Sequence, residues 1–311
     1  MLKYLVIILS NQSISFCNYE NSKGSNLQTI STENLKAAIK FGMKENLMIQ
    51  FVYPVYELPT EYTKLIESID HIKIKPIKNS GQDDIGIINN WSELSQPISS
   101  DTIIVRTSIQ ELMSNKEMLL KAMKKHKRVN IALTDIDSCE MELIFDYKNW
   151  LINFAINDVK KFSMEKGHIP QLNILSDRLI LKKMNNCNAG VDSITIGPDG
   201  NLYICPAFYY NNHPNIGNIE DGIIFKNDLL KFDRAPICRI CDAWQCKRCV
   251  WLNQKQTHEL NTPGKRQCLI SHIEREASRL LLKTLRENGP YMPNIKIEQL
   301  DYNEPFEKLS I

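Results

Sequence analysis

Residues 238–249 read CRICDAWQCKRC, which is two Cys-x2-Cys turns separated by four residues, and Cys268 follows after eighteen more. A Cys-x2-Cys turn lets two thiolates bind one ion or cluster, so two such turns supply four soft ligands. Zinc and iron–sulfur clusters both suit four thiolates at this spacing, and the residues alone do not separate the two. A segment this rich in cysteine and turns usually depends on metal for its fold.

A predicted β-hairpin lies upstream, flanked by two more cysteines. Residues 193–196, SITI, and 202–204, LYI, are rich in the residues that favour strands, and Gly197-Pro198-Asp199-Gly200 between them is a turn sequence. A hairpin would bring Cys187 and Cys205 together at its open end. Seven of the nine cysteines thus fall between residues 187 and 268. A disulfide framework is disfavoured because the count is odd, the chain is large and no export signal is present.

The first 184 residues alternate short apolar runs with helix-like segments. We predict six strands and four intervening helices, and this alternation is typical of parallel βαβ units. Residues 85–88 form either an extra strand or an extended connection. The predicted strands are 4–9, 47–53, 72–76, 102–106, 130–133 and 171–175, and the predicted helices are 31–43, 60–69, 110–127 and 140–166. Six strands favour an open partial (β/α)6 barrel over a closed eight-stranded one.

The charge balance excludes two classes of partner. The chain has 38 basic and 36 acidic residues, a formal net charge of +2, which is too little to drive binding to nucleic acid or to an anionic membrane. No apolar run approaches the roughly 20 residues that a membrane-spanning helix needs. The N-terminal run is short and lacks a small-residue cleavage site, so we interpret it as a buried first strand of a cytoplasmic protein.

The cysteine-rich part of the chain resembles a known family. The hairpin, the Ile216-Gly217-Asn218-Ile219 step and the seven cysteines are similar to the SPASM domain, an extension of radical-SAM enzymes that modify ribosomally made peptides. More narrowly, the chain resembles the CXXX-repeat peptide maturase group. The gaps of four and two residues between the later cysteines depart from the family's usual five and three. The resemblance implies two auxiliary 4Fe–4S clusters, held by two sets of cysteines: Cys187, Cys205 and Cys249 for the first, and Cys238, Cys241, Cys246 and Cys268 for the second.

Two expected features of the family are missing. The loop after the first strand carries only Cys17, where a radical-SAM enzyme has three cysteines, and residues 53–57, YPVYE, replace the Gly-Gly-Glu signature. No cysteine lies between Cys139 and Cys187, so the first set has three thiolates unless Cys139 or another ligand completes it. We therefore expect a degenerate radical-SAM-like barrel (1–184), a SPASM-like iron–sulfur domain (185–270) and a C-terminal helix and tail (271–311), with no SAM bound.

The resemblance favours an accessory, pseudo-radical-SAM subunit in the maturation of a Cys-rich precursor peptide. Such a subunit would bind one or two auxiliary clusters and the peptide, and it would work beside a catalytic radical-SAM protein. No catalytic residue is assigned, and the chain is not expected to cleave SAM on its own. Two alternatives stay open: a zinc-stabilised scaffold that binds a peptide or protein, and a stand-alone iron–sulfur redox enzyme.

Other candidate residues have plainer interpretations. Cys17 is interpreted as a small buried residue. The histidines near the cysteines, His213, His258 and His272, are interpreted as surface or packing residues, with His213 the candidate extra ligand. Lys247 and Arg248 would offset the negative charge of a cluster or contact a partner.

Overall fold

The computed structural model describes residues 2–21, 26–302 and 305–306. Two compact units are present, and each is made from two separated segments of the chain. Unit 1 contains Met1–Ile104 and Cys187–Arg234, and unit 2 contains Val105–Asn186 and Ala235–Ile311.

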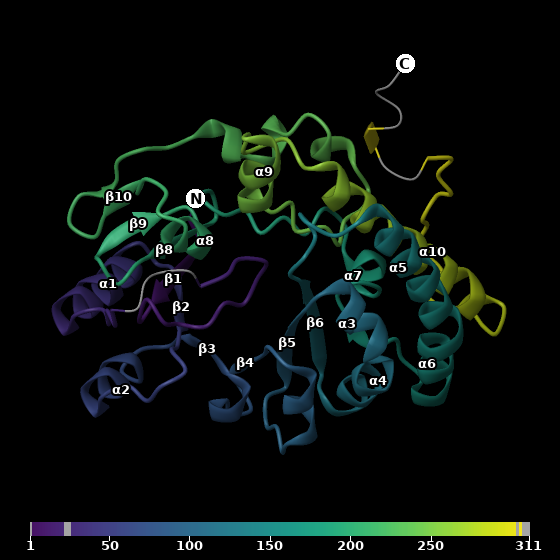
Figure 1. Ribbon diagram of the computed structural model, residues 1–311, viewed down its shortest axis with the longest axis horizontal. Coiled ribbons are helices and arrows are strands. Elements are labelled where there is room, and N and C mark those ends of the chain that lie inside the picture. Colours follow the sequence, from purple (N-terminus) through teal and green to yellow (C-terminus); the bar gives the residue numbers. More distant parts are fainter. Residues whose placement is uncertain (1, 22–25, 303–304, 307–311) are drawn as a thin grey trace. The chain divides into compact units, whose positions relative to one another are not determined.

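Unit 1 is built on a sheet whose strands follow the order β11-β10-β9-β8-β1-β2-β3-β4 (Figure 1). Neighbouring strands are parallel in the part of the sheet ordered β8-β1-β2-β3-β4. Neighbouring strands are antiparallel in the part ordered β11-β10-β9-β8. The strands are β1 (Tyr4–Ile8), β2 (Met48–Val52), β3 (Ile72–Pro76), β4 (Ile85–Ile88), β8 (Ser193–Ile196), β9 (Asn201–Tyr203), β10 (Gly217–Asn218) and β11 (Gly222–Ile223). The helices and 3-10 turns are α1 (Thr32–Lys44), α2 (Thr60–Ile66), α8 (Pro206–Tyr210), η1 (Ile77–Asn79), η2 (Trp91–Ser95), η4 (Asp228–Leu230) and η5 (Phe232–Arg234).

The two faces of this sheet are covered differently. Leu5 and Ile7 of β1 face a core that includes Leu35 of α1 and Ile66 of α2. Val6, on the opposite face, packs with residues of the segment that follows β1, among them Ile14 and Phe16. Strands buried on both faces explain the continuous apolar runs in the sequence. The segment after β1 therefore packs on the sheet face opposite the core that α1 and α2 help to form.

Helix α1 begins at the N-cap that the sequence predicted, Ser31. The Ser31 side chain accepts a hydrogen bond from the Asn34 N–H at 3.1 Å, which satisfies one of the unpaired amides of the first turn. The predicted hairpin is also confirmed, since Ile196 of β8 pairs with Leu202 of β9. Gly200 adopts φ +80 in its turn, a conformation that glycine adopts without steric cost.

Gly217 allows β10 to approach β11. Its φ is +149, and a Cβ atom at this position would lie 1.9 Å from the Gly222 carbonyl oxygen. We expect Gly217→Ala to lower the free energy of unfolding by at least about 2 kcal/mol, because both the backbone conformation and the space require glycine. Urea denaturation of the full chain measures the change.

Gly222→Ala is the matched control for this prediction. Gly222 also has a positive φ, +74, but nothing lies within 4 Å of its would-be Cβ. Its substitution should cost only about 1 kcal/mol, the conformational part of the effect. Equal losses for the two variants would show that the contact with Gly222 is unimportant.

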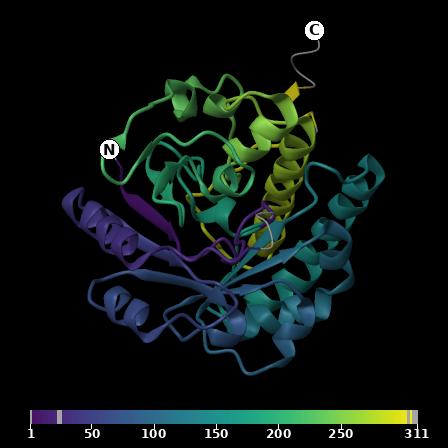
Figure 2. The ribbon, with the colours of Figure 1, turned by 60° about the vertical axis from the view of Figure 1, so that its left-hand side comes forward.

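Unit 2 is dominated by helices around a small sheet in the order β5-β6-β7. The long helix α10 packs against α5, α6 and α7, as Figures 1 and 2 show. The strands are β5 (Thr102–Thr107), β6 (Arg128–Leu133) and β7 (Gln171–Leu172). The helices are α3 (Ile109–Ser114), α4 (Lys116–Lys125), α5 (Met141–Asn153), α6 (Lys160–Lys166), α7 (Asp177–Ile180), α9 (Val250–Thr257) and α10 (Lys265–Arg286), with a π-helical segment η3 (Phe154–Val159) and a 3-10 turn η6 (Cys238–Ile240).

The expected α/β fold with a parallel sheet is confirmed, with local differences. Residues 85–88 are a full strand, β4, paired parallel to β3. The helix predicted over 110–127 is two helices, because Asn115 turns its side chain back onto the Glu111 carbonyl and interrupts the helix. The helix predicted over 140–166 contains the π segment η3. Among the helices described, none combines the length and apolar character needed to cross a membrane.

The predicted SPASM-like segment 185–270 is divided between the units. Its hairpin part, up to Arg234, belongs to unit 1, and its Cys-x2-Cys part belongs to unit 2. The three predicted domains, 1–184, 185–270 and 271–311, stay a prediction made from the sequence.

Candidate functional site

The second set of cysteines lies on a turn-rich segment of unit 2. Cys238 begins η6, and Cys241 is its C-cap residue. The Cys241 sulfur accepts a hydrogen bond from the Ala243 N–H at 3.4 Å, and the Cys246 sulfur accepts one from the Arg248 N–H at 3.4 Å. Backbone N–H groups aimed at sulfur stabilise thiolates, so both turns are formed in the way that a ligand turn requires.

One face of α10 lies against these turns. His272 brings its Nε2 atom to 3.4 Å from the Cys241 sulfur. Burial raises the pKa of Cys246. Hydrogen bonds between its thiol and the side chains of Ser271 and Gln267 lower that pKa and so offset part of the rise. Cys268 lies one helical turn before His272 on the same face and is itself buried. α10 therefore presents Cys268 to the turns that carry the other three cysteines.

The thiols of this set lie near one another in a largely water-free environment. Burial, with smaller contributions from the neighbouring Cys246 and Cys241, raises the pKa of Cys238 to about 12, against the lowering effect of Arg248. Burial likewise raises the pKa of Cys241 to about 11, against the lowering effect of Arg275. These thiols hold their protons until a metal displaces them, since only the thiolate binds metal.

Three arginines in this part of unit 2 are almost completely buried. Arg178, Arg248 and Arg275 expose 2%, 0% and 1% of their surface. Arg275 binds the Asp242 carboxylate with two hydrogen bonds of 2.6 Å, and Arg178 binds the same carboxylate at 3.1 Å. The Arg178 guanidinium also lies over the Trp244 ring, 4.2 Å from its centre. Two guanidinium groups thus share one carboxylate beside the cysteine turns, which leaves an excess of positive charge there.

Asp242 holds this arrangement together, and its removal should be costly. We expect Asp242→Asn to lower the free energy of unfolding of unit 2 by about 2 kcal/mol, because two buried guanidinium groups lose their counter-charge. The expected loss is at the low end for buried pairs, since the Asp242 side chain is 35% exposed. Urea denaturation of the purified full chain measures it.

Asp228→Asn is the control for the Asp242 variant. It removes an exposed ion pair with Lys231 and should change stability by less than about 0.5 kcal/mol. If the two variants lose the same stability, the shared carboxylate has no special role.

The residues of the second set fit a thiophilic centre. Four cysteines supply soft ligands, backbone N–H groups face two of the sulfurs, and buried arginines match the negative charge of metal-bound thiolates. In the described part of the chain, no three Cys, His, Asp or Glu side chains already stand at the mutual distances of a formed metal site. Metal binding would therefore draw the sulfurs closer together.

The first predicted set is distributed over both units. Cys187 and Cys205 lie in unit 1, where Cys205 immediately precedes α8 and is followed by Pro206. Burial raises the pKa of Cys205 most, and the Cys187 thiol makes a smaller contribution in the same direction. Cys249 belongs to unit 2, where it is the N-cap residue of α9. Cys187 and Cys205 thus belong to one unit and flank the observed hairpin, and the assignment of Cys187, Cys205 and Cys249 to one ligand set stays a prediction.

Several residues lie in surroundings that the sequence did not indicate. The interpretation of Cys17 as buried is wrong, since Cys17 is exposed. Cys139, which could have completed the first set, is buried in unit 2, where its N–H donates to the Asp135 carbonyl at 2.8 Å. His213 packs its ring on Phe208, with 5.0 Å between ring centres. His272 is a histidine that does lie beside a cysteine, Cys241. Its spacing of four residues from Cys268 on a predicted helix could have indicated from the sequence that it lies near the cysteine turns.

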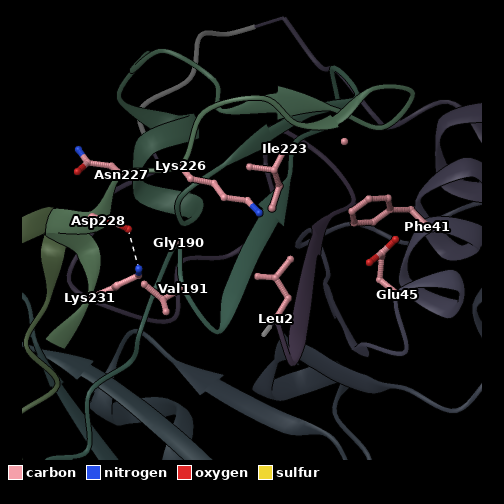
Figure 3. A pocket seen from close by; sticks show the side chains of 11 residues that line it. Leu2, Phe41, Glu45, Gly190, Val191, Ile223, Lys226, Asn227, Asp228 and Lys231 are labelled. Atoms are coloured by element: carbon pink, nitrogen blue, oxygen red, sulfur yellow. Dashed lines mark ion pairs between the residues drawn. The ribbon is translucent and has the colours of Figure 1, made fainter. Parts of the chain in front are cut away.

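A separate cavity of about 540 Å³ opens in unit 1 (Figure 3). Leu2, Phe41 and Ile223 belong to its apolar lining, and the Lys226 side chain extends into it toward Ile223. Beside it, Asp228 and Lys231 form an ion pair of 2.7 Å. This volume accommodates a small ligand or a few side chains of a peptide.

Comparison with known proteins identifies a fold but no family. No family model matches the chain, and no curated protein matches its sequence. The fold is similar to that of native anSMEcpe, solved with bound AdoMet and the Cp18Cys peptide, with a TM-score of 0.63 and 13% identity over 95% of this chain and 100% of that one. A weaker likeness is to Streptococcus suis SuiB bound to the precursor peptide SuiA, with a TM-score of 0.48 and 9% identity over 86% of this chain and 76% of that one. The chain therefore has the α/β fold of a protein that binds AdoMet and a peptide, and at 13% identity the likeness establishes the fold alone.

Proposed function

We propose that this chain is an accessory subunit in the maturation of a ribosomally made, Cys-rich peptide. It binds one or two auxiliary 4Fe–4S clusters and the precursor peptide, and it works beside a radical-SAM enzyme that supplies the radical. It does not bind SAM for catalysis itself.

The fold and the segment after β1 support the accessory role. The fold is shared with a protein solved with AdoMet and a peptide bound. In this chain the segment that follows β1 has a single cysteine, and one thiolate cannot hold a 4Fe–4S cluster with an iron open to SAM. The cavity in unit 1 has the volume for side chains of a bound peptide.

The second set of cysteines, together with the buried arginines, carries the proposal. Cys238, Cys241, Cys246 and Cys268 would hold one cluster, and a bound 4Fe–4S cluster supplies one-electron transfer. Arg248 and Arg275 already lower the pKa of Cys238 and Cys241 against the effect of burial. Their charge therefore favours the anionic thiolates that such a cluster requires. Trp251, which is 8% exposed in the same unit, helps to keep water out of the interior.

Metal analysis of anaerobically purified protein tests the proposal. About eight irons with equal acid-labile sulfide per chain would indicate two clusters, and about four would indicate one. Incubation with SAM and a reductant is the second measurement, and no 5′-deoxyadenosine is expected from the chain alone. Reductive cleavage of SAM by the purified chain would overturn the accessory role.

A zinc-stabilised, peptide-binding scaffold is the second candidate, and one distance favours it. Two ligands of a single tetrahedral zinc ion, one sulfur and one imidazole nitrogen, lie roughly 3.5 Å apart. The Cys241 sulfur and the His272 Nε2 atom are 3.4 Å apart. Stoichiometric zinc without sulfide in the same metal analysis would establish this candidate in place of the first.

A further inference from the structure

The segment after β1 is attached firmly to α8 within unit 1. The Tyr19 ring stacks on the Tyr210 ring, with 5.5 Å between centres and 15° between planes. The Tyr210 hydroxyl donates to the Ser13 carbonyl at 3.2 Å. Tyr19 and Tyr210 are 3% and 1% exposed, so this contact belongs to the core.

This attachment brings Cys17 close to Cys205. Cys17 lies two residues before Tyr19, and Cys205 immediately precedes the helix that carries Tyr210. The stacked rings therefore hold the segment that carries Cys17 beside the helix that Cys205 precedes.

Backbone packing brings Cys187 to the same place. Gly190 donates its N–H to the Ser193 carbonyl at 2.7 Å, at the start of the hairpin. A Cβ atom on Gly190 would lie 3.2 Å from the Ile204 side chain, which directly precedes Cys205. The short segment from Cys187 to Gly190 therefore runs beside the end of the hairpin at which Cys205 lies.

We propose that Cys17, Cys187 and Cys205 form one binding site for a thiophilic metal centre, either zinc or an iron–sulfur cluster, in unit 1. Cys17 then supplies the thiolate that the first set otherwise lacks. Cys17 and Cys187 lie at the surface and Cys205 is partly buried, so the two outer side chains can turn toward Cys205 when metal binds. The inference rests on the proposed function, because it gives the first set a third ligand within a single unit.

Alkylation of individual cysteines tests this site without an activity assay. The full chain is stripped of metal and then loaded either with Zn²⁺ alone or with iron and sulfide under anaerobic conditions. Iodoacetamide labelling of each cysteine is followed by mass spectrometry. We expect one of the two loadings to slow the labelling of Cys17 and Cys187 at least tenfold relative to the stripped chain. The loading that protects them identifies the centre.

Cys17→Ser and Cys139→Ser are the paired variants. Cys17→Ser should return the labelling of Cys187 to the rate of the stripped chain, whereas Cys139→Ser should leave it slow. The inference is overturned if Cys17 labels equally fast with and without metal under both loadings, or if Cys187 stays protected in Cys17→Ser. Far-UV circular dichroism of both variants verifies that they are folded.

The same labelling data separate this inference from the proposed function. Protection of the second set, Cys238, Cys241, Cys246 and Cys268, reports on the metal centre of unit 2. If only that set is protected, the site at Cys17 is wrong and the metal centre of the proposed function stands. If only Cys17, Cys187 and Cys205 are protected, the site at Cys17 stands and the metal centre proposed for unit 2 is wrong.

Discussion

Cys241→Ser is expected to lose the metal centre proposed for unit 2 completely. Cys241 is the cysteine of the second set that contacts both a backbone N–H, from Ala243, and the His272 ring. A serine hydroxyl is a poor ligand for zinc and for iron–sulfur clusters, which select soft thiolates. Iron should fall by about four per chain if a cluster is bound. The unfolding temperature of unit 2 should fall by roughly 10 °C or more, because metal-binding energy contributes directly to folding.

Cys139→Ser is the matched control for this prediction as well. Cys139 is a buried cysteine of the same unit that is outside both predicted sets. Its replacement should leave the iron and zinc content unchanged, as measured by inductively coupled plasma mass spectrometry. Full metal content in Cys241→Ser would remove Cys241 from the ligand set.

The second large effect concerns a buried carboxyl group on α10. Burial raises the pKa of Glu274 to about 8 from an ordinary value of 4.5, although hydrogen bonds from Gln245 and Tyr147 lower it. The folded protein therefore keeps the proton of Glu274 between pH 4.5 and 8, whereas the unfolded chain releases it. Because the unfolded state binds fewer protons in this window, the free energy of unfolding falls as pH rises. The loss amounts to roughly 5 kcal/mol and is complete above pH 8.

Glu274→Gln should remove this loss. Glutamine is neutral at every pH in the window and can still hydrogen-bond Gln245 and Tyr147, so the variant should be more stable than the wild type by several kcal/mol above pH 8. Urea denaturation between pH 5 and pH 9 measures the slope for both proteins. Glu276→Gln, which removes a partly exposed pair with Arg279, should keep the wild-type slope. Parallel slopes for wild type and Glu274→Gln would show that Glu274 ionises normally in the folded protein.

The sequence predicts most of the parallel sheet, because strands such as β1 and β4 are continuous apolar runs. β1 illustrates this, since Leu5 and Ile7 face one core and Val6 the other. Helix interruptions were harder to predict. Asn115 ends α3 by bonding the Glu111 carbonyl, yet the apolar spacing continues through it. A local side-chain to backbone bond leaves no mark on the hydrophobic pattern.

The candidate site was predictable where its residues are close in the chain. The Cys-x2-Cys turns were visible directly, and Arg248 lies within them. Arg178 and Arg275 were not predictable, since they reach Asp242 from α7 and α10 and only the folded chain brings them together. Cys17 was misjudged because cysteine is usually buried. Here Tyr19, two residues on, occupies the interior position and leaves Cys17 at the surface.

The construction of each unit from two separated segments has a consequence for biosynthesis. On the ribosome, β1 must wait for β8, because Tyr4 pairs with Ser193. Residues 105–186 emerge before the α10 helix that packs on α5. A nascent chain ending near residue 186 therefore contains about two thirds of unit 1, about half of unit 2 and neither complete core, and such long-range contacts slow folding. Cysteines 238–249 emerge before α10 does, so their exposed thiols need a reducing environment or an early metal donor until α10 is synthesised.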